Sequence, residues 1–238
     1  MKRTQLFTLA SLMIASSGLA SATTITFQGL DAARSAQVWM NFTYLAGDLM
    51  LNGNTASSTT SVNEQIGVGV LNVAFDGSLQ LQDAFCVDRF RYISNGNYTV
   101  NVSAPSTVTN GARAAWLLHD ILPQINAAPV GTQQRNLAAA LQMAIWDIIQ
   151  DGGDGFTAGR IRRSTSSSNP TDSIILTLAN SFITQSNGQS YTNALVLSNV
   201  NVNSYTQRLI VDGVPEPSTW ALALTGLLWA GIRRAKRV

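Results

Sequence analysis

The first half of the chain alternates runs of β-branched and aromatic residues with clusters of Gly, Asn and Ser. This pattern is typical of β-strands joined by turns. The run from Tyr98 to Val102 alternates apolar and polar side chains as a half-buried strand does, and Asn95-Gly96 before it is a strong turn signal. We therefore expect strands at residues 24–27, 38–51, 67–75 and 98–102.

The middle of the chain changes to a helical spacing of apolar residues. Pro123 is expected to end the first helix. The second helix carries an apolar stripe widened by further apolar residues, which predicts that most of its surface is buried. Asn136 is its expected N-cap and Gly152-Gly153 its stop. Helices are expected at residues 110–122, 136–150 and 173–184.

Two closing strands are expected at residues 194–197 and 208–211, and the chain shows no internal repeat. Strands, then helices, then strands indicate the α+β class. The expected architecture is a β-sandwich or barrel-like sheet with an inserted helical subdomain.

The N-terminus has the three parts of a secretion signal. Lys2 and Arg3 precede a short apolar run, and Ala20-x-Ala22 is a signal-peptidase pattern, so we expect residues 1–22 to be removed by cleavage before Thr23. A transmembrane anchor is the alternative, but the run is short and diluted by serines.

The C-terminus reads Pro215-Glu216-Pro217, then an uncharged segment at 219–232 that contains two Trp, then an Arg-rich end. Such a segment can sit in lipid as a marginal transmembrane helix, with the cations on the cytoplasmic side. The three parts in this order resemble the PEP-CTERM sorting signal, at residues 214–238. The resemblance implies processing by an exosortase, and delivery to the cell envelope, outer surface or extracellular matrix of a Gram-negative bacterium that makes extracellular polysaccharide. A transient inner-membrane anchor would be part of that route. A plain C-terminal membrane anchor is the alternative.

The remaining body, residues 23–213, is slightly acidic. Of 15 basic residues six lie in the two ends, and of 13 acidic residues one does, which leaves nine against twelve. No basic stripe survives, so we expect no nucleic-acid partner.

The single cysteine, Cys86, is unusual in an exported protein, where cysteines are normally paired. It lies in Phe85-Cys86-Val87-Asp88, and the helix downstream contains Leu141-Gln142-Met143-Ala144-Ile145-Trp146. Together, and in this order, the two motifs resemble the thioester domains of bacterial surface adhesins. The resemblance implies a bond between Cys86 and Gln142, formed between the sheet and the helical subdomain.

In that chemistry the thiolate attacks the Gln142 carboxamide and expels ammonia, and the stored acyl group passes to a partner's amine or hydroxyl. The partner would be a surface-protein amine or a polysaccharide hydroxyl. Because each molecule reacts once, we expect a covalent binder for adhesion or matrix linking, with no cofactor or metal, rather than an enzyme. The body has no lysine, which fits either a bias toward Arg or the avoidance of self-coupling.

Four neighbours have expected supporting roles. Trp146 and Phe85 would shield the bond from water, and Asp88 would fix the Cys86 loop, although core packing and a turn are the ordinary alternatives. Ile145 belongs to the helix motif. His119, the only histidine, can be a core or cap residue, an assistant to acyl transfer, or the base of a hydrolase.

Three further readings stay open at this stage. Asp151-Gly152-Gly153-Asp154-Gly155 lacks the full spacing of a calcium loop, and a helix-ending turn is preferred. For the whole protein the alternatives are a non-covalent structural protein of the biofilm matrix and a secreted cysteine hydrolase.

Overall fold

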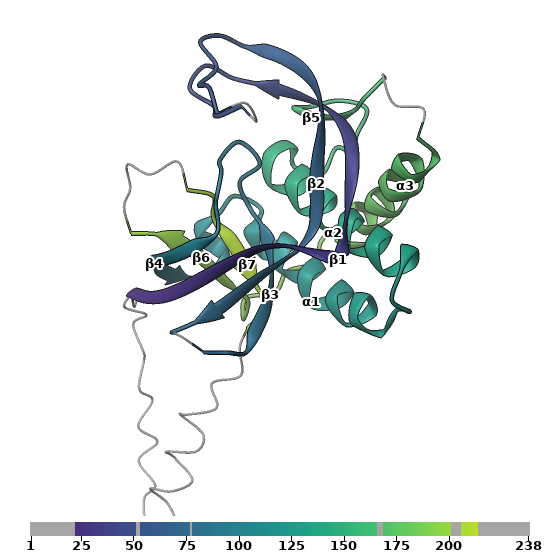
Figure 1. The fold of residues 1–238 in the computed structure, drawn as a ribbon. Coiled ribbons are helices and arrows are strands. Elements are labelled where there is room, and N and C mark those ends of the chain that lie inside the picture. The colour runs from purple at the N-terminus through teal and green to yellow at the C-terminus, as the bar shows by residue number, and fades with distance from the viewer. Residues whose placement is uncertain (1–21, 51–52, 77, 166–168, 201–205, 214–238) are drawn as a thin grey trace, which may run out of the picture.

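The computed structural model describes residues 22–50, 53–76, 78–165, 169–200 and 206–213. They form one antiparallel sheet with three helices packed on one side of it (Figure 1). The strands are β1 (Ala22–Tyr44), β2 (Thr60–Phe75), β3 (Leu81–Cys86), β4 (Gly96–Ser103), β5 (Ile161–Arg163), β6 (Leu195–Asn199) and β7 (Leu209–Val211). The helices are α1 (Gly111–Ala127), α2 (Thr132–Asp151) and α3 (Pro170–Gln185), with a short 3-10 turn, η1 (Pro105–Thr107).

The sheet closes on itself. Its order is β2-β3-β7-β6-β4-β1-β5, and β1 also pairs with β2. Ile25 in β1 lies opposite Phe75 of β2 on one side and Tyr98 of β4 on the other. Six strands therefore make a closed circuit, while β5 pairs with the far half of β1 outside it. The expected barrel-like sheet with a helical part is therefore confirmed.

β1 corrects the sequence expectation of two separate strands at 24–27 and 38–51. It is one strand that ends at Tyr44, with irregular register between Phe27 and Gly29 and between Leu30 and Ser35. The stretch between the two expected strands is part of β1, at the place where the paired β1 and β2 bend (Figure 1). The short strands β3 and β5 were not predicted, because neither shows a clear apolar alternation.

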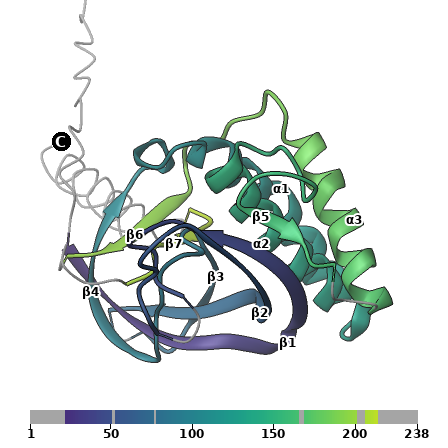
Figure 2. The ribbon, with the colours of Figure 1, turned by 90° about the horizontal axis from the view of Figure 1, so that it is seen from above.

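α2 is the central helix. It packs on β1 and β2, and α1 and α3 pack against it (Figure 2). Every residue from Ala138 to Ile149 is buried, as the widened apolar stripe predicted. The expected N-cap was wrong: the helix begins at Thr132 after Gly131, and Asn136 lies within it. Its expected stop is confirmed, since Gly152 adopts the left-handed conformation with φ 77°.

α1 does not end at Pro123, as the sequence suggested. It continues to Ala127, where Ile125 is fully buried and holds the last turn on the core. A proline removes the hydrogen bond to the carbonyl four residues earlier, that of His119. His119 and Pro123 are both exposed, so water can reach that carbonyl. The stability gained by burying the last turn of α1 outweighs the cost of the hydrogen bond that Pro123 removes.

Most of both expected targeting segments lies outside the described residues. Ala20 and the sorting motif Pro215, Glu216 and Pro217 belong there, as does the expected transmembrane helix at 219–232. Ala22 is described and is the first residue of β1. Within the described ranges, no helix has the length and apolar character needed to cross a membrane.

Candidate functional site

Cys86 and Gln142 meet between the sheet and the helices. Cys86 is the last residue of β3, and Gln142 lies in the middle of α2. Both are buried, with 7% and 1% of their surface exposed. Burial of a glutamine requires hydrogen-bond partners for both ends of its carboxamide.

Those partners are the two backbone groups of Cys86. The Cys86 N–H donates to Gln142 Oε1 at 2.8 Å, and Gln142 Nε2 donates to the Cys86 carbonyl at 2.9 Å. The amide is thus fixed at both ends against the residue that carries the thiol. The Gln142 carbon Cδ, which is bonded to Oε1 and Nε2, is therefore held beside the Cys86 backbone.

The strand pairing explains why Cys86 needs such a partner. β2 pairs with β3 only as far as Leu71 opposite Ala84, and continuing that register would bring Gly69 opposite Cys86. Instead Gly69 pairs with Ser35 of β1 and has φ 146°. A side chain there would clash with the Arg34 carbonyl, at 2.3 Å from the added Cβ. β2 therefore turns away, and the Gln142 carboxamide takes the place of the missing strand.

The surroundings keep the Cys86 thiol neutral. Burial raises the pKa of the thiol, the Asp88 carboxylate adds to this, and the Arg89 guanidinium opposes it. A neutral buried thiol is a poor free nucleophile. The same low polarity would protect a thioester from water once it had formed.

Asp88 ties the segment after Cys86 to the residues just before β7. Its carboxylate accepts from Arg208 Nε at 2.7 Å, Arg208 Nη2 at 2.5 Å and the Arg208 backbone N–H at 3.1 Å. The Asp88 carbonyl accepts from Gln207 Nε2 at 2.7 Å. The backbone donor to Asp88 lies 120 residues away in the sequence, and the expected role of Asp88 in fixing the Cys86 loop stays a prediction.

Arg89 is a buried cation that the sequence analysis missed. Its guanidinium lies 3.8 Å from the Phe42 ring centroid and 5.7 Å from that of Trp146, and it pairs with Glu64 at 3.0 Å. In the sequence, the only sign of a role for Arg89 is its position directly after the Cys86 motif. Among the described residues, Arg89 Nε has no hydrogen-bond acceptor.

The aromatic and apolar residues of the two motifs divide into two groups. Trp146 is one helical turn beyond Gln142, is 4% exposed, and its indole N–H has no acceptor among the described residues. Phe85 and Ile145 are fully buried in the core. Because successive side chains of a strand point to opposite faces, Phe85 leaves β3 on the side away from Cys86. This position supports a role for Phe85 in packing the core more than in shielding the Cys86–Gln142 pair.

A groove of about 510 Å³ leads to the pair from outside. Cys86, Arg89 and Trp146 line it, whereas Gln142 is not part of the lining. β1, β2 and the segment 91–95 supply its other walls, and Arg91 and Tyr92 are exposed there. No carboxylate belongs to this lining. A partner would therefore reach Cys86 first, past two arginines.

His119 lies elsewhere. Its ring stacks on Tyr191 with centroids 4.1 Å apart, and its Nδ1 is 3.2 Å from an Asp212 carboxylate oxygen. It is half exposed. Among the described residues no hydrogen bond or ring contact joins it to Cys86. A role for His119 in acyl transfer stays a prediction.

No protein-family model and no curated protein matches the chain. Solved structures that resemble it include two domains of bacterial surface proteins. The N-terminal domain of the Streptococcus pyogenes pilus tip adhesin Cpa has a TM-score of 0.40 and 11% identity, over 73% of this chain and 92% of that one. The N-terminal thioester domain of a surface protein from Clostridium perfringens has a TM-score of 0.37 and 10% identity, over 74% and 98%.

Proposed function

We propose that this chain is an exported surface protein that attaches itself covalently to a partner through a thioester between Cys86 and Gln142. The observation that supports this most is the pair of hydrogen bonds between the Gln142 carboxamide and the Cys86 backbone. They hold the acyl carbon beside the residue that carries the thiol, which is the positioning that an intramolecular reaction requires.

The first step forms the bond. The Cys86 thiol loses its proton and Sγ attacks Gln142 Cδ, the Cδ–Nε2 bond breaks, and the nitrogen leaves as ammonia with that proton. In the second step a partner's amine or hydroxyl attacks Cδ, the Cδ–Sγ bond breaks, and the thiol is restored. The product is an amide or an ester of the Gln142 acyl group. No cofactor is needed, and each molecule reacts once.

Two unpaired donors support the second step. Negative charge develops on the acyl oxygen as the nucleophile adds, and buried N–H groups stabilise such charge strongly. Arg89 Nε and Trp146 Nε1 are buried donors without acceptors among the described residues, and both side chains line the groove with Cys86. We assign them to the acyl oxygen of the reacting state.

The charge of the groove also affects which kind of nucleophile can react. Its lining contains Arg89 and Arg91 and no carboxylate, so a lysine ammonium gains nothing there and must lose its proton before it reacts. A polysaccharide hydroxyl carries no such penalty. Adhesion or linking of an extracellular matrix fits both nucleophiles, and delivery by an exosortase and a sorting tail is part of the same proposal.

The mass of the fresh, purified protein tests the bond. The wild type is expected to be lighter than its sequence by one ammonia, and Cys86 should resist alkylation until methylamine opens the thioester. Cys86→Ala and Gln142→Ala should each restore the full mass. Gln134→Ala is the matched control, because Gln134 is another buried glutamine of α2, bonded to the Ile125 carbonyl, and it should keep the mass loss.

The same measurement separates the alternatives. A full sequence mass with Cys86 open to alkylation would refute the proposal and leave a non-covalent matrix protein. A hydrolase would need a base beside Cys86, and among the described contacts His119 does not provide one. Loss of an intact thioester in His119→Ala would make that histidine part of the chemistry. Comparison of methylamine with glycerol as the opening reagent reports the preferred nucleophile.

A further inference from the structure

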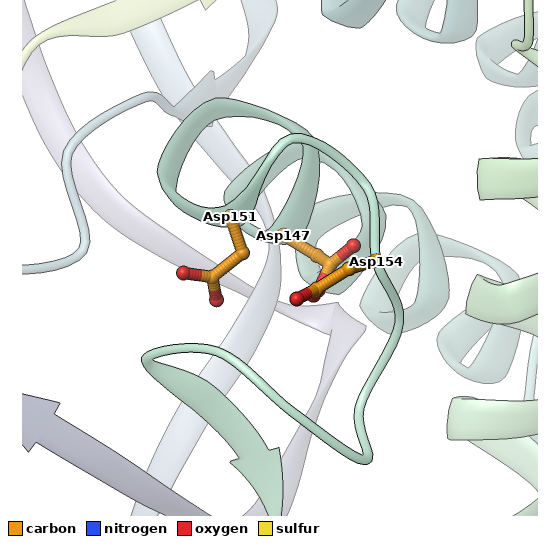
Figure 3. Close-up of side chains that lie close together, drawn as sticks. All are labelled: Asp147, Asp151 and Asp154. Atoms are coloured by element: carbon orange, nitrogen blue, oxygen red, sulfur yellow. The ribbon is translucent and has the colours of Figure 1, made fainter.

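Three carboxylates gather where α2 ends. Asp147 and Asp151 lie four residues apart on one face of the helix, and Asp154 returns to them after the turn at Gly152 and Gly153. Each offers an oxygen, and these oxygens all lie within 4.8 Å of one another. Figure 3 shows the Asp147 and Asp154 carboxylates next to each other, with Asp151 to one side of them.

Asp147 is the unusual member of this cluster. It is fully buried, and its Oδ1 has no hydrogen-bond partner among the described residues. Its other oxygen accepts only the Gly155 N–H, at 3.2 Å. Burial raises the pKa of this carboxyl to about 7, against the opposing Gly155 hydrogen bond, and the neighbouring Asp154 and Asp151 add to the rise. The charge of Arg113 opposes this rise, but no ion pair joins the two groups. A buried carboxylate without an ion-pair partner is costly, so a cation or a proton would stabilise the unpaired oxygen.

The nearby arginines are committed to other partners. The Arg113 guanidinium donates to the carbonyls of Gly152 and Ile183 and to two polar side chains. The Arg160 guanidinium pairs with Asp48 instead, although its backbone N–H reaches Asp151. Neither arginine makes an ion pair with Asp147.

We propose that Asp147, Asp151 and Asp154 bind a calcium ion. Carboxylate oxygens are the ligands of hard cations, and the cluster contains no sulfur or imidazole that would favour zinc. Oxygens within 4.8 Å of one another can share one cation, and Ca²⁺ accepts an irregular set of carboxylates and waters, whereas Mg²⁺ demands near-ideal octahedral geometry. Waters complete the shell from the side of Asp154, which is exposed.

The ion would join α2 to the segment that follows it. The Asp151 carboxylate already accepts from the N–H groups of Arg160 and Ile161, so a bound ion would brace the loop up to β5. The helix-ending turn expected from the sequence is present at Gly152, and it is this turn that brings Asp154 back to the helix. The site does not depend on the thioester.

Thermal unfolding of the purified chain, after removal of metals with EGTA, tests the proposal. An affinity in the range of extracellular calcium modules, Kd of about 1 mM, gives an 11-fold larger folded-to-unfolded ratio at about 10 mM CaCl₂. For a domain of this size the Tm should rise by about 3–6 °C. MgCl₂ at the same concentration should raise it by less than half as much.

Two variants and two controls locate the effect. Asp154→Asn changes an exposed residue and should fold normally, yet it should lose most of the calcium shift, as should Asp147→Asn. Asp120→Asn, at an exposed position of α1, should keep the full shift. Cys86→Ala should also keep it, so a failed thioester would leave this result unchanged.

Three outcomes would overturn the proposal. One is a wild-type Tm that calcium does not move, another is a shift that survives in both Asp147→Asn and Asp154→Asn, and the third is an equal or larger response to magnesium.

Discussion

The hydrogen bonds between Gln142 and Cys86 can be measured apart from any covalent bond. Cys86→Ala removes the sulfur, so no thioester can form, but residue 86 keeps its backbone N–H and carbonyl. Adding Gln142→Leu to this variant then removes the carboxamide alone, with a side chain of similar size. The difference between the two proteins reports only the reciprocal pair.

The expected difference is large because both backbone groups are buried. Each would be left without a partner, at a cost of about 1–3 kcal/mol. Together they lower the free energy of unfolding by about 2–6 kcal/mol. For a domain of this size each kcal/mol shifts Tm by about 2–4 °C, so Tm should fall by about 4–24 °C.

Urea denaturation of the two proteins gives this quantity directly, provided that the slope m is the same in both. The matched control is Gln134→Leu in the same Cys86→Ala protein. Gln134 makes one hydrogen bond, to the Ile125 carbonyl at 3.0 Å, so its loss should cost about 1–3 kcal/mol. If Gln142→Leu costs no more than Gln134→Leu, the carboxamide does not substitute for a strand at Cys86.

Three further predictions follow from the same contacts. Trp146→Phe should keep the thioester intact in water, because an aromatic ring remains, but the loss of the N–H should slow its opening by methylamine about tenfold. An unchanged opening rate in a mass-spectrometric time course would contradict the role of the indole N–H. Arg208→Gln should lower the free energy of unfolding, measured in urea, by about 1–3 kcal/mol, because the buried Asp88 carboxylate loses its bidentate guanidinium partner. Arg208→Lys should restore only part of this stability. Gly152→Ala should cost about 1 kcal/mol through the left-handed backbone alone, since no atom lies within 4 Å of the added methyl group; a neutral effect on Tm would refute this.

The pair Cys86 and Gln142 could be proposed from sequence because their motifs are local. Phe85-Cys86-Val87-Asp88 and the Gln142 helix are both readable as short patterns, and the buried character of α2 follows from its apolar stripe. The way the two residues meet could not be foreseen. It depends on the turn of β2 away from β3 at Gly69, which is set by close contact with the Arg34 carbonyl, far from either motif.

Arg89 and the path of β1 were missed for a similar reason. A charged residue after a cysteine motif suggests an exposed loop, and only Phe42 and Glu64, brought near by the paired β1 and β2, make burial of Arg89 favourable. The polar stretch 28–35 looks like a loop until Arg34 is seen bonded to Asp83 in β3. In each case the deciding partner is distant in the sequence.

The separation of 56 residues between Cys86 and Gln142 has a consequence for timing. An unfolded chain carries an ordinary amide and an ordinary thiol, with nothing to bring them together. They meet only after β3 has entered the sheet and α2 has docked on it. If the proposed thioester forms, the unfolded chain is therefore an inert precursor, and completion of the fold itself switches on the reactive bond.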